Sequence, residues 1–71
     1  METIDARGLS CPEPVLRARR AMQRLAPGDE VAVLVDNATS RENVLRAARS
    51  LACDARVEPL EGGFRLIARR R

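Results

Sequence analysis

The stretch Gly8-Leu9-Ser10-Cys11-Pro12-Glu13-Pro14-Val15 marks the point where an extended segment should turn into a helix. Proline is tolerated in the first turn of a helix, because the N–H group that it lacks has no intrahelical partner there and its fixed φ suits the helix. Pro12 and Pro14 therefore predict the first turn of a helix from Pro12 to Leu25. The same pattern places Cys11 at or next to the helix N-cap, in a junction that a partner can reach.

The segments on either side of this stretch predict a βαβ unit. Thr3–Arg7 alternates polar and apolar residues, the pattern of a half-buried strand, with Ile4 and Ala6 toward the core. Glu30–Val35 is apolar on adjacent positions, which is typical of a central strand. A strand, a helix and a second strand in this order predict parallel strands joined by a right-handed crossover. The buried stripe of the helix is predicted to comprise Val15, Ala18, Met22 and Leu25.

A second helix is predicted by the capping box Thr39-Ser40-Arg41-Glu42, with Thr39 at the N-cap and the side chain of Glu42 reaching back. This helix is expected to run to about Ala52, so that Cys53 falls at its end. Its buried face is predicted to comprise Val44, Leu45, Ala48, Leu51 and Ala52.

The last part of the chain predicts a β-hairpin. Arg56–Glu58 is a short strand-like segment, and Pro59 after it suits an edge strand. Glu61-Gly62-Gly63 predicts the turn, Phe64–Ala68 the last strand, and Arg69–Arg71 a frayed tail. The resulting order β-α-β-α-β-β predicts an α/β fold of the α+β two-layer type, with two helices on one face of a four-stranded mixed sheet.

The composition of the 71 residues indicates a single domain over residues 1–71 and excludes several kinds of chemistry. The chain has no histidine, which removes cysteine–histidine catalysis and most zinc sites, so we expect no metal and no cofactor. Its two cysteines are not a Cys-x-x-Cys pair, which excludes a thioredoxin-type dithiol. Phe64 is the only aromatic residue, so contact with nucleic acid would be limited to the backbone, without base stacking.

Nothing in the sequence predicts a membrane segment or an export signal. No stretch approaches the ~20 apolar residues of a membrane helix, and the first residues lack the basic and apolar regions of a signal peptide. We therefore expect a cytoplasmic protein with no membrane partner, in a compartment where thiols stay reduced.

Cys11 is the candidate reactive group. The thiolate is the reactive form of cysteine, and a helix N-terminus favours negative charge, whereas the carboxylate of Glu13 opposes it. The free N–H groups near the sulfur are predicted to be those of Glu13, Val15 and Leu16. The alternative interpretation is a small, inert, buried cysteine. Cys53 is interpreted as a packing residue, with a redox partner of Cys11 as the alternative.

Arginines on the predicted first helix leave two interpretations open. Arg17, Arg20 and Arg24 lie opposite the buried stripe, as an ordinary solvated face would. The functional interpretation is a docking surface beside the thiol, for which Arg17 is the stronger candidate and Arg20 the weaker one, because guanidinium groups bind carboxylates in bidentate fashion.

The segment Asp5–Val15 closely resembles the Cys-Pro-x-Pro signature of the TusA/SirA-like sulfur carriers. The resemblance covers essentially the whole chain, and the fold of that family is the βαβαββ sandwich. Val35–Ala38 together with Arg41–Val44 is similar to the N-terminal domain of YedF-like proteins, a subgroup associated with selenium metabolism. The motif and positioning residues around Cys11 are predicted to be Gly8, Leu9, Pro12, Glu13 and Pro14.

This resemblance implies that Cys11 accepts sulfane sulfur as a persulfide and passes it to another protein. The implied donor is a cysteine desulfurase or a rhodanese-like enzyme, and the sulfur goes to a downstream acceptor protein, with tRNA thiolation, molybdenum cofactor synthesis and sulfur oxidation among the destinations. Two other classes stay open. One is a thiol redox or regulatory module in which Cys11 and Cys53 act together, and the other is a non-catalytic adaptor or RNA-backbone binder that uses its arginines.

Overall fold

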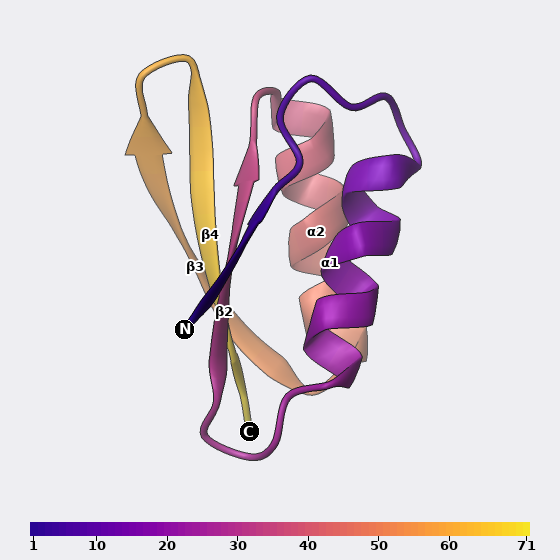
Figure 1. The fold of residues 1–71 in the computed structure, drawn as a ribbon, viewed down its shortest axis with the longest axis vertical. Helices are drawn as coiled ribbons and strands as arrows, with labels where there is room; N and C mark the ends of the chain where they lie inside the picture. Colours follow the sequence, from indigo (N-terminus) through magenta and orange to yellow (C-terminus); the bar gives the residue numbers. More distant parts are fainter.

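The computed structural model describes all residues from 1 to 71 and has the predicted order of strands and helices (Figure 1). The elements are β1 (Glu2–Asp5), α1 (Glu13–Gln23), β2 (Glu30–Val35), α2 (Ala38–Ser50), β3 (Cys53–Leu60) and β4 (Gly63–Arg70). Neither helix has the length and apolar character that a crossing of the bilayer requires.

The strands form one mixed sheet in the order β1-β2-β4-β3. β1 and β2 are parallel neighbours, with Ile4 opposite Val33, and the remaining pairs are antiparallel. Both helices cover the same face of this sheet (Figure 1). The predicted two-layer sandwich and the parallel βαβ unit are therefore confirmed. Because α1 follows β1 and α2 follows β2, both helices begin at the edge of the sheet where the parallel strands end.

The core lies between the helices and the sheet. Every second residue of β2 faces the helices, so Val31, Val33 and Val35 are fully buried against α1 and α2. Ala18 and Met22 of α1 have no exposed surface, and the predicted stripe continues through the partly buried side chains at either end of the helix. The apolar periodicity of the sequence therefore identified the face of α1 that packs on the sheet.

Helix α1 is shorter at both ends than the predicted span. It begins at Glu13 rather than Pro12, because Pro12 is the N-cap residue and has non-helical torsion angles, φ −98° and ψ 13°. It ends at Gln23, two residues before Leu25. Pro14 occupies the first turn as predicted and is buried.

The predicted capping box of α2 is wrong. The N-cap is Asn37, whose Oδ1 accepts the backbone N–H of Ser40 at 2.8 Å, so the helix begins before Thr39. Asparagine is at least as favourable as threonine at an N-cap, since its side-chain oxygen satisfies a free N–H of the first turn. Glu42 does not reach back to the cap and instead lies 3.1 Å from the guanidinium of Arg41.

The end of α2 also differs from the prediction. The helix stops at Ser50, and Ala52 adopts a positive φ of 59°, which reverses the chain and leaves its side chain exposed rather than buried. Cys53 is consequently not a helical residue but the first residue of β3. Its burial agrees with the interpretation as a packing residue, since only 2% of its surface is exposed.

The C-terminal hairpin is longer than the sequence predicted. β3 runs from Cys53 to Leu60 instead of Arg56 to Glu58, and it is an edge strand that tolerates Pro59. Both strands pair along their whole lengths, from Cys53 opposite Arg70 to Leu60 opposite Gly63. Strand pairing therefore extended β3 over residues of low intrinsic β propensity.

The predicted frayed tail is mostly strand. β4 continues to Arg70, whose backbone exchanges hydrogen bonds with the loop between α1 and β2: its N–H donates to the carbonyl of Asp29 at 3.0 Å, and its carbonyl accepts from Gly28 at 2.9 Å. Arg71 donates its N–H to the carbonyl of Ala52. Hydrogen bonds to residues distant in the sequence therefore order the C-terminal arginines, which the sequence alone predicted to be a frayed, solvated tail.

Candidate functional site

Cys11 lies in the turn that connects β1 to α1, directly before the N-cap residue of the helix. The residue is exposed and forms no disulfide, and its peptide bond to Pro12 is cis. Two backbone hydrogen bonds close the turn around it, from Glu13 to the carbonyl of Ser10 at 2.9 Å and from Leu16 to the carbonyl of Pro12 at 3.0 Å. The thiol is therefore held at the surface by ordered backbone on both sides.

One backbone donor is left free at this helix start, rather than the three that the sequence predicted. The N–H groups of Glu13 and Leu16 are used within the turn, while Pro14 has none. The N–H of Val15 donates to no acceptor in the protein. The turn therefore leaves only Val15 as an unpaired backbone donor of the first helical turn, the kind of group that favours negative charge at a helix N-terminus.

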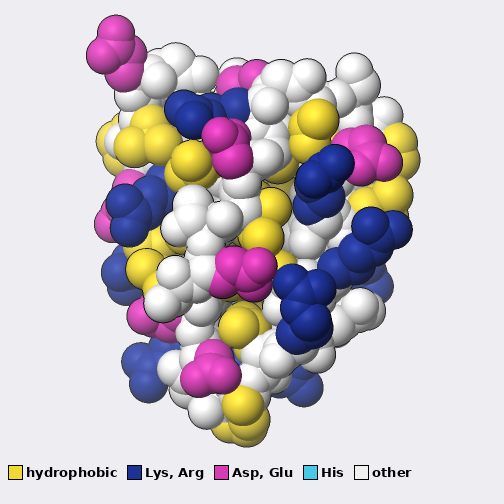
Figure 2. Space-filling model, viewed as in Figure 1, with side chains coloured by type: hydrophobic (Ala, Val, Ile, Leu, Met, Phe, Trp, Pro, Cys, Tyr) yellow, Lys and Arg dark blue, Asp and Glu magenta, His cyan; other side chains and the backbone are white.

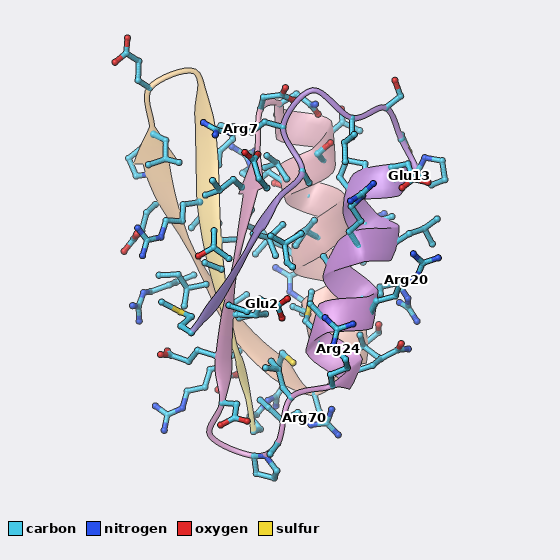
Figure 3. The ribbon with its side chains drawn as sticks, in the orientation of Figure 1. Glu2, Arg7, Glu13, Arg20, Arg24 and Arg70 are labelled. Carbon is cyan, nitrogen blue, oxygen red and sulfur yellow. The ribbon has the colours of Figure 1, made fainter.

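The carboxylate of Glu13 forms an ion pair with an arginine of the same helix. Arg17, one turn later, lies with its Nε 3.4 Å from Oε2 of Glu13, and both side chains are about half exposed. Figure 3 shows Glu13 at the start of α1 and Arg20 on the outer side of the same helix. Arg20 forms no ion pair. Of the two predicted docking arginines, Arg20 thus has the guanidinium without an internal acidic partner.

The loop before Cys11 is tied to the rest of the fold at Gly8 and Leu9. Gly8 has a φ of 77°, a conformation that favours glycine, and its N–H donates to Oδ2 of Asp36 at 2.6 Å. The side chain of Leu9 packs against the buried core. These two contacts hold the chain three and two residues before the thiol, and the positioning role of Gly8 and Leu9 stays a prediction.

The carboxylate of Asp36 is the contact that sequence reasoning missed. It lies just after β2, and besides Gly8 it accepts a hydrogen bond from Nδ2 of Asn37 at 3.0 Å. Asn37 in turn caps α2. The cysteine loop, the end of β2 and the start of α2 are thereby joined through one side chain. The signal was present in the sequence, since the loops that follow two neighbouring parallel strands emerge at the same edge of a sheet.

A second polar contact orders the exit of β1. Arg7 donates from its backbone N–H and from its guanidinium to the carboxylate of Asp5, with Nη2 2.9 Å from Oδ2. The hydrogen bonds from Arg7 lower the pKa of Asp5 to about 2. The expected strand Thr3–Arg7 ends at Asp5 because Arg7 folds back onto it.

The second cysteine is remote from the first. Cys53 is buried, and its thiol lies 3.6 Å from the carbonyl oxygen of Leu51. Cys11 precedes α1 at the end of the sheet where β1 finishes. Cys53 begins β3 at the opposite end of the sheet, because β3 runs in the same direction as β1 and β2 (Figure 1). The fold keeps the two sulfur atoms at opposite ends of the sheet, so it does not bring them together as a redox pair.

Residues 2–70 match the family described as Sulfurtransferase TusA. The chain belongs to that family. A protein of Archaeoglobus fulgidus named "Putative sulfur carrier protein" is 34% identical over 64 residues, which span 89% of this chain and 83% of that protein. The crystal structure of a SirA-like protein from Desulfitobacterium hafniense is 38% identical, with a TM-score of 0.87 over 97% of this chain and 96% of that one.

Membership of the TusA family confirms the resemblance drawn from the segment around Cys11, and the SirA-like structure confirms the fold. It assigns the chain to the sulfurtransferases and sulfur carriers in general. This chain and the SirA-like protein share one small α+β scaffold. In this chain that scaffold presents a single exposed thiol, held in place from both sides by backbone hydrogen bonds.

Proposed function

We propose that this TusA-family protein carries sulfane sulfur as a persulfide on Cys11 and hands it to an acceptor protein. The observation that supports this most is the contrast between the two thiols, since Cys11 is exposed at the start of α1 and Cys53 is buried in the core. A carrier needs one accessible sulfur atom on a stable scaffold, and residues 1–71 supply both as one carrier domain.

The proposed reaction is a thiol exchange that needs no external oxidant or reductant. The Cys11 thiolate attacks the outer sulfur of a donor persulfide, so that a sulfur–sulfur bond forms on Cys11 while the one in the donor breaks and the donor leaves as a thiolate. In the second step a thiolate of the acceptor attacks the outer sulfur on Cys11 in the same way. Cys11 leaves as the thiolate and the carrier is restored.

The proposed partners are a cysteine desulfurase or a rhodanese-like enzyme as donor, and a downstream protein as acceptor. Both must reach the same thiol in turn, so each contact is transient. The first two turns of α1, which follow Cys11 in the chain, offer two exposed side chains for this purpose: the apolar group of Leu16 and the unpaired cation of Arg20. The sequence favoured Arg17 over Arg20 for docking, but the ion pair with Glu13 leaves the guanidinium of Arg17 less available.

The test compares single substitutions at the two cysteines. Wild-type protein, Cys11→Ser and Cys53→Ala are each incubated with a cysteine desulfurase and cysteine, and in parallel with a low-molecular-weight persulfide. Intact mass spectrometry should show a gain of about 32 Da per sulfur atom, reversed by a thiol reductant, in the wild type and in Cys53→Ala only. Peptide mapping should place the added sulfur on Cys11.

The outcomes separate the proposal from the redox alternative. Sulfur on Cys53, or full loading of Cys11→Ser, would refute the carrier mechanism as stated. Loss of two hydrogens with formation of a Cys11–Cys53 disulfide would instead favour a redox module, which would require the two ends of the sheet to approach one another. Circular dichroism of Cys11→Ser should match the wild type, because the exposed thiol contributes no packing to the core.

A further inference from the structure

The positive charge of the molecule is concentrated on its helical layer. The chain has 13 basic and 10 acidic residues, but α1 and α2 contain only two acids, Glu13 and Glu42, each paired with an arginine of its own helix. In Figure 2, dark-blue side chains follow one another along the α1 side of the view, whereas basic and acidic groups alternate on the sheet side. The exposed face of the helices is therefore the electropositive face of the protein.

The arginines that lack an ion pair show where this charge is available. Arginines of the sheet and the loops largely pair with neighbouring carboxylates, as Arg56 and Arg65 do with Glu58. Four of the six unpaired arginines belong to the two helices. The unpaired arginines of the chain are Arg19, Arg20, Arg46, Arg49, Arg69 and Arg70.

Two of these arginines face one another across an open groove of about 390 Å³ between α1 and α2. We call it the interhelical groove. It begins at Val15, one turn from Cys11, and Val15 and Ala47 give it an apolar floor. Its six lining residues are Val15, Arg19, Asn43, Arg46, Ala47 and Ser50.

Ser50 orients one of the two guanidinium groups. Its hydroxyl donates to the carbonyl of Ala47 at 3.0 Å, and its oxygen lies 3.4 Å from Nη1 of Arg19. Arg19 is therefore drawn across from α1 toward α2, on whose side Arg46 and the amide of Asn43 stand. Two guanidinium groups and an amide around an apolar floor match the requirements of a carboxylate on an aliphatic stem.

We propose that the interhelical groove binds an acidic segment of a partner protein, with a glutamate or aspartate carboxylate between Arg19 and Arg46. An acidic protein segment fits better than nucleic acid, because none of the groove's lining residues is aromatic and a base would have nothing on which to stack. That this partner is a sulfur donor or acceptor rests on the proposed function. Binding itself does not involve the thiol.

The experiment uses a fluorescein-labelled peptide of glutamate residues, titrated with the full chain and followed by fluorescence anisotropy. We expect binding that weakens with added salt. Arg46→Glu should weaken it at least tenfold, and Ser50→Ala by a few-fold, because Arg19 loses the group that orients it. Arg49→Glu is the matched control: it makes the same change of charge on the same helix, at an unpaired arginine outside the groove, and should change affinity by less than twofold.

A second readout locates the peptide. In a nuclear magnetic resonance titration, the side-chain amide of Asn43 and the backbone amides of the groove should shift, while those of β3 and β4 should not. Equal weakening by Arg46→Glu and Arg49→Glu, or shifts confined to the sheet, would overturn the proposal. Binding of a single-stranded RNA that is lost in Arg46→Glu, without binding of the peptide, would assign the groove to phosphates instead.

This test is separable from that of the carrier mechanism. Cys11→Ser should bind the peptide with the affinity of the wild type, and Arg46→Glu should still load sulfur from a low-molecular-weight persulfide at the wild-type rate. If the wild-type protein binds the peptide but does not load sulfur, only the carrier mechanism is refuted. If it loads sulfur but does not bind the peptide, only the proposal for the interhelical groove is refuted.

Discussion

Removal of the Asp36 carboxylate tests whether a residue distant in the sequence positions the loop that carries Cys11. In Asp36→Ala, Gly8 loses the acceptor that lies 2.6 Å from its N–H, and Asn37 loses the acceptor of its side-chain amide. The N–H of Gly8 makes no other hydrogen bond in the structure. The loop would then be held by the packing of Leu9 and by the backbone bonds of the turn.

The size of the effect follows from the kind of bond that is lost. A hydrogen bond to a charged group contributes about 1.5–3 kcal/mol, and exposure to solvent puts this one at the lower end. A local loss of about 1.4 kcal/mol corresponds to a factor of ten in the population of the opened loop. We therefore expect the amide hydrogen of Gly8 to exchange with solvent about ten times faster in Asp36→Ala, with a smaller change in global stability.

The assay is amide hydrogen exchange of Gly8 at fixed pH, read together with the rate of persulfide transfer from Cys11 to a small thiol. Asp36→Asn keeps an oxygen acceptor without the charge and should recover part of the protection. Asp54→Ala is the control, since Asp54 is an exposed carboxylate at the other end of the sheet, beside Arg71. Unchanged exchange at Gly8 in Asp36→Ala would show that the carboxylate does not hold the loop, and the positioning argument would fail.

Two further predictions concern the scaffold. A Cβ at Gly63 would collide with the backbone carbonyl oxygen of Val35, so Gly63→Ala should lower the free energy of unfolding by about 1–3 kcal/mol in urea denaturation, and an unchanged midpoint would contradict the tight β2–β4 contact. The carboxyl group of Asp5 should titrate near pH 2, because Arg7 lowers its pKa from 3.8 to about 2. A lowered folded-state pKa means that the pair contributes stability above the unfolded pKa of about 3.9, which is lost as the pH falls toward 2. Arg7→Ala should return the midpoint, followed by nuclear magnetic resonance of the side chain, toward 3.8, and an unmoved midpoint would exclude Arg7 as the cause.

The sequence alone determined the order of the elements, most of the residues that each buries and the candidate residue for the chemistry. These properties depend on local patterns. The spacing of Ala18 and Met22 identified the buried side of α1, the continuous apolar run in β2 identified a central strand, and the prolines after Cys11 marked where a helix starts.

Element boundaries were the weaker part of the prediction, because they depend on partners. The sequence around Cys53 has no strand pattern of its own, yet the residue pairs with Arg70 and so begins β3. Arg70 belongs to β4 rather than to a tail because the loop at Gly28 and Asp29 supplies hydrogen-bond partners to its backbone. The N-cap of α2 is a closer case, since Asn37 and Thr39 are both suitable and only the path of the chain after β2 selects between them.

Tertiary structure alone decided which groups meet. Asp36 is 28 residues from Gly8, and nothing local connects them until parallel pairing of β1 and β2 brings the ends of both strands to one edge of the sheet. The antiparallel pairing of β4 with both β2 and β3 makes β3 run in the direction of β1, which places Cys53 at the end of the sheet opposite Cys11. Arg19 and Arg46 share a groove because two crossovers of the same hand lay α1 beside α2 on one face. Hydrophobic periodicity acts within an element, whereas these contacts arise only when strands pair and helices pack.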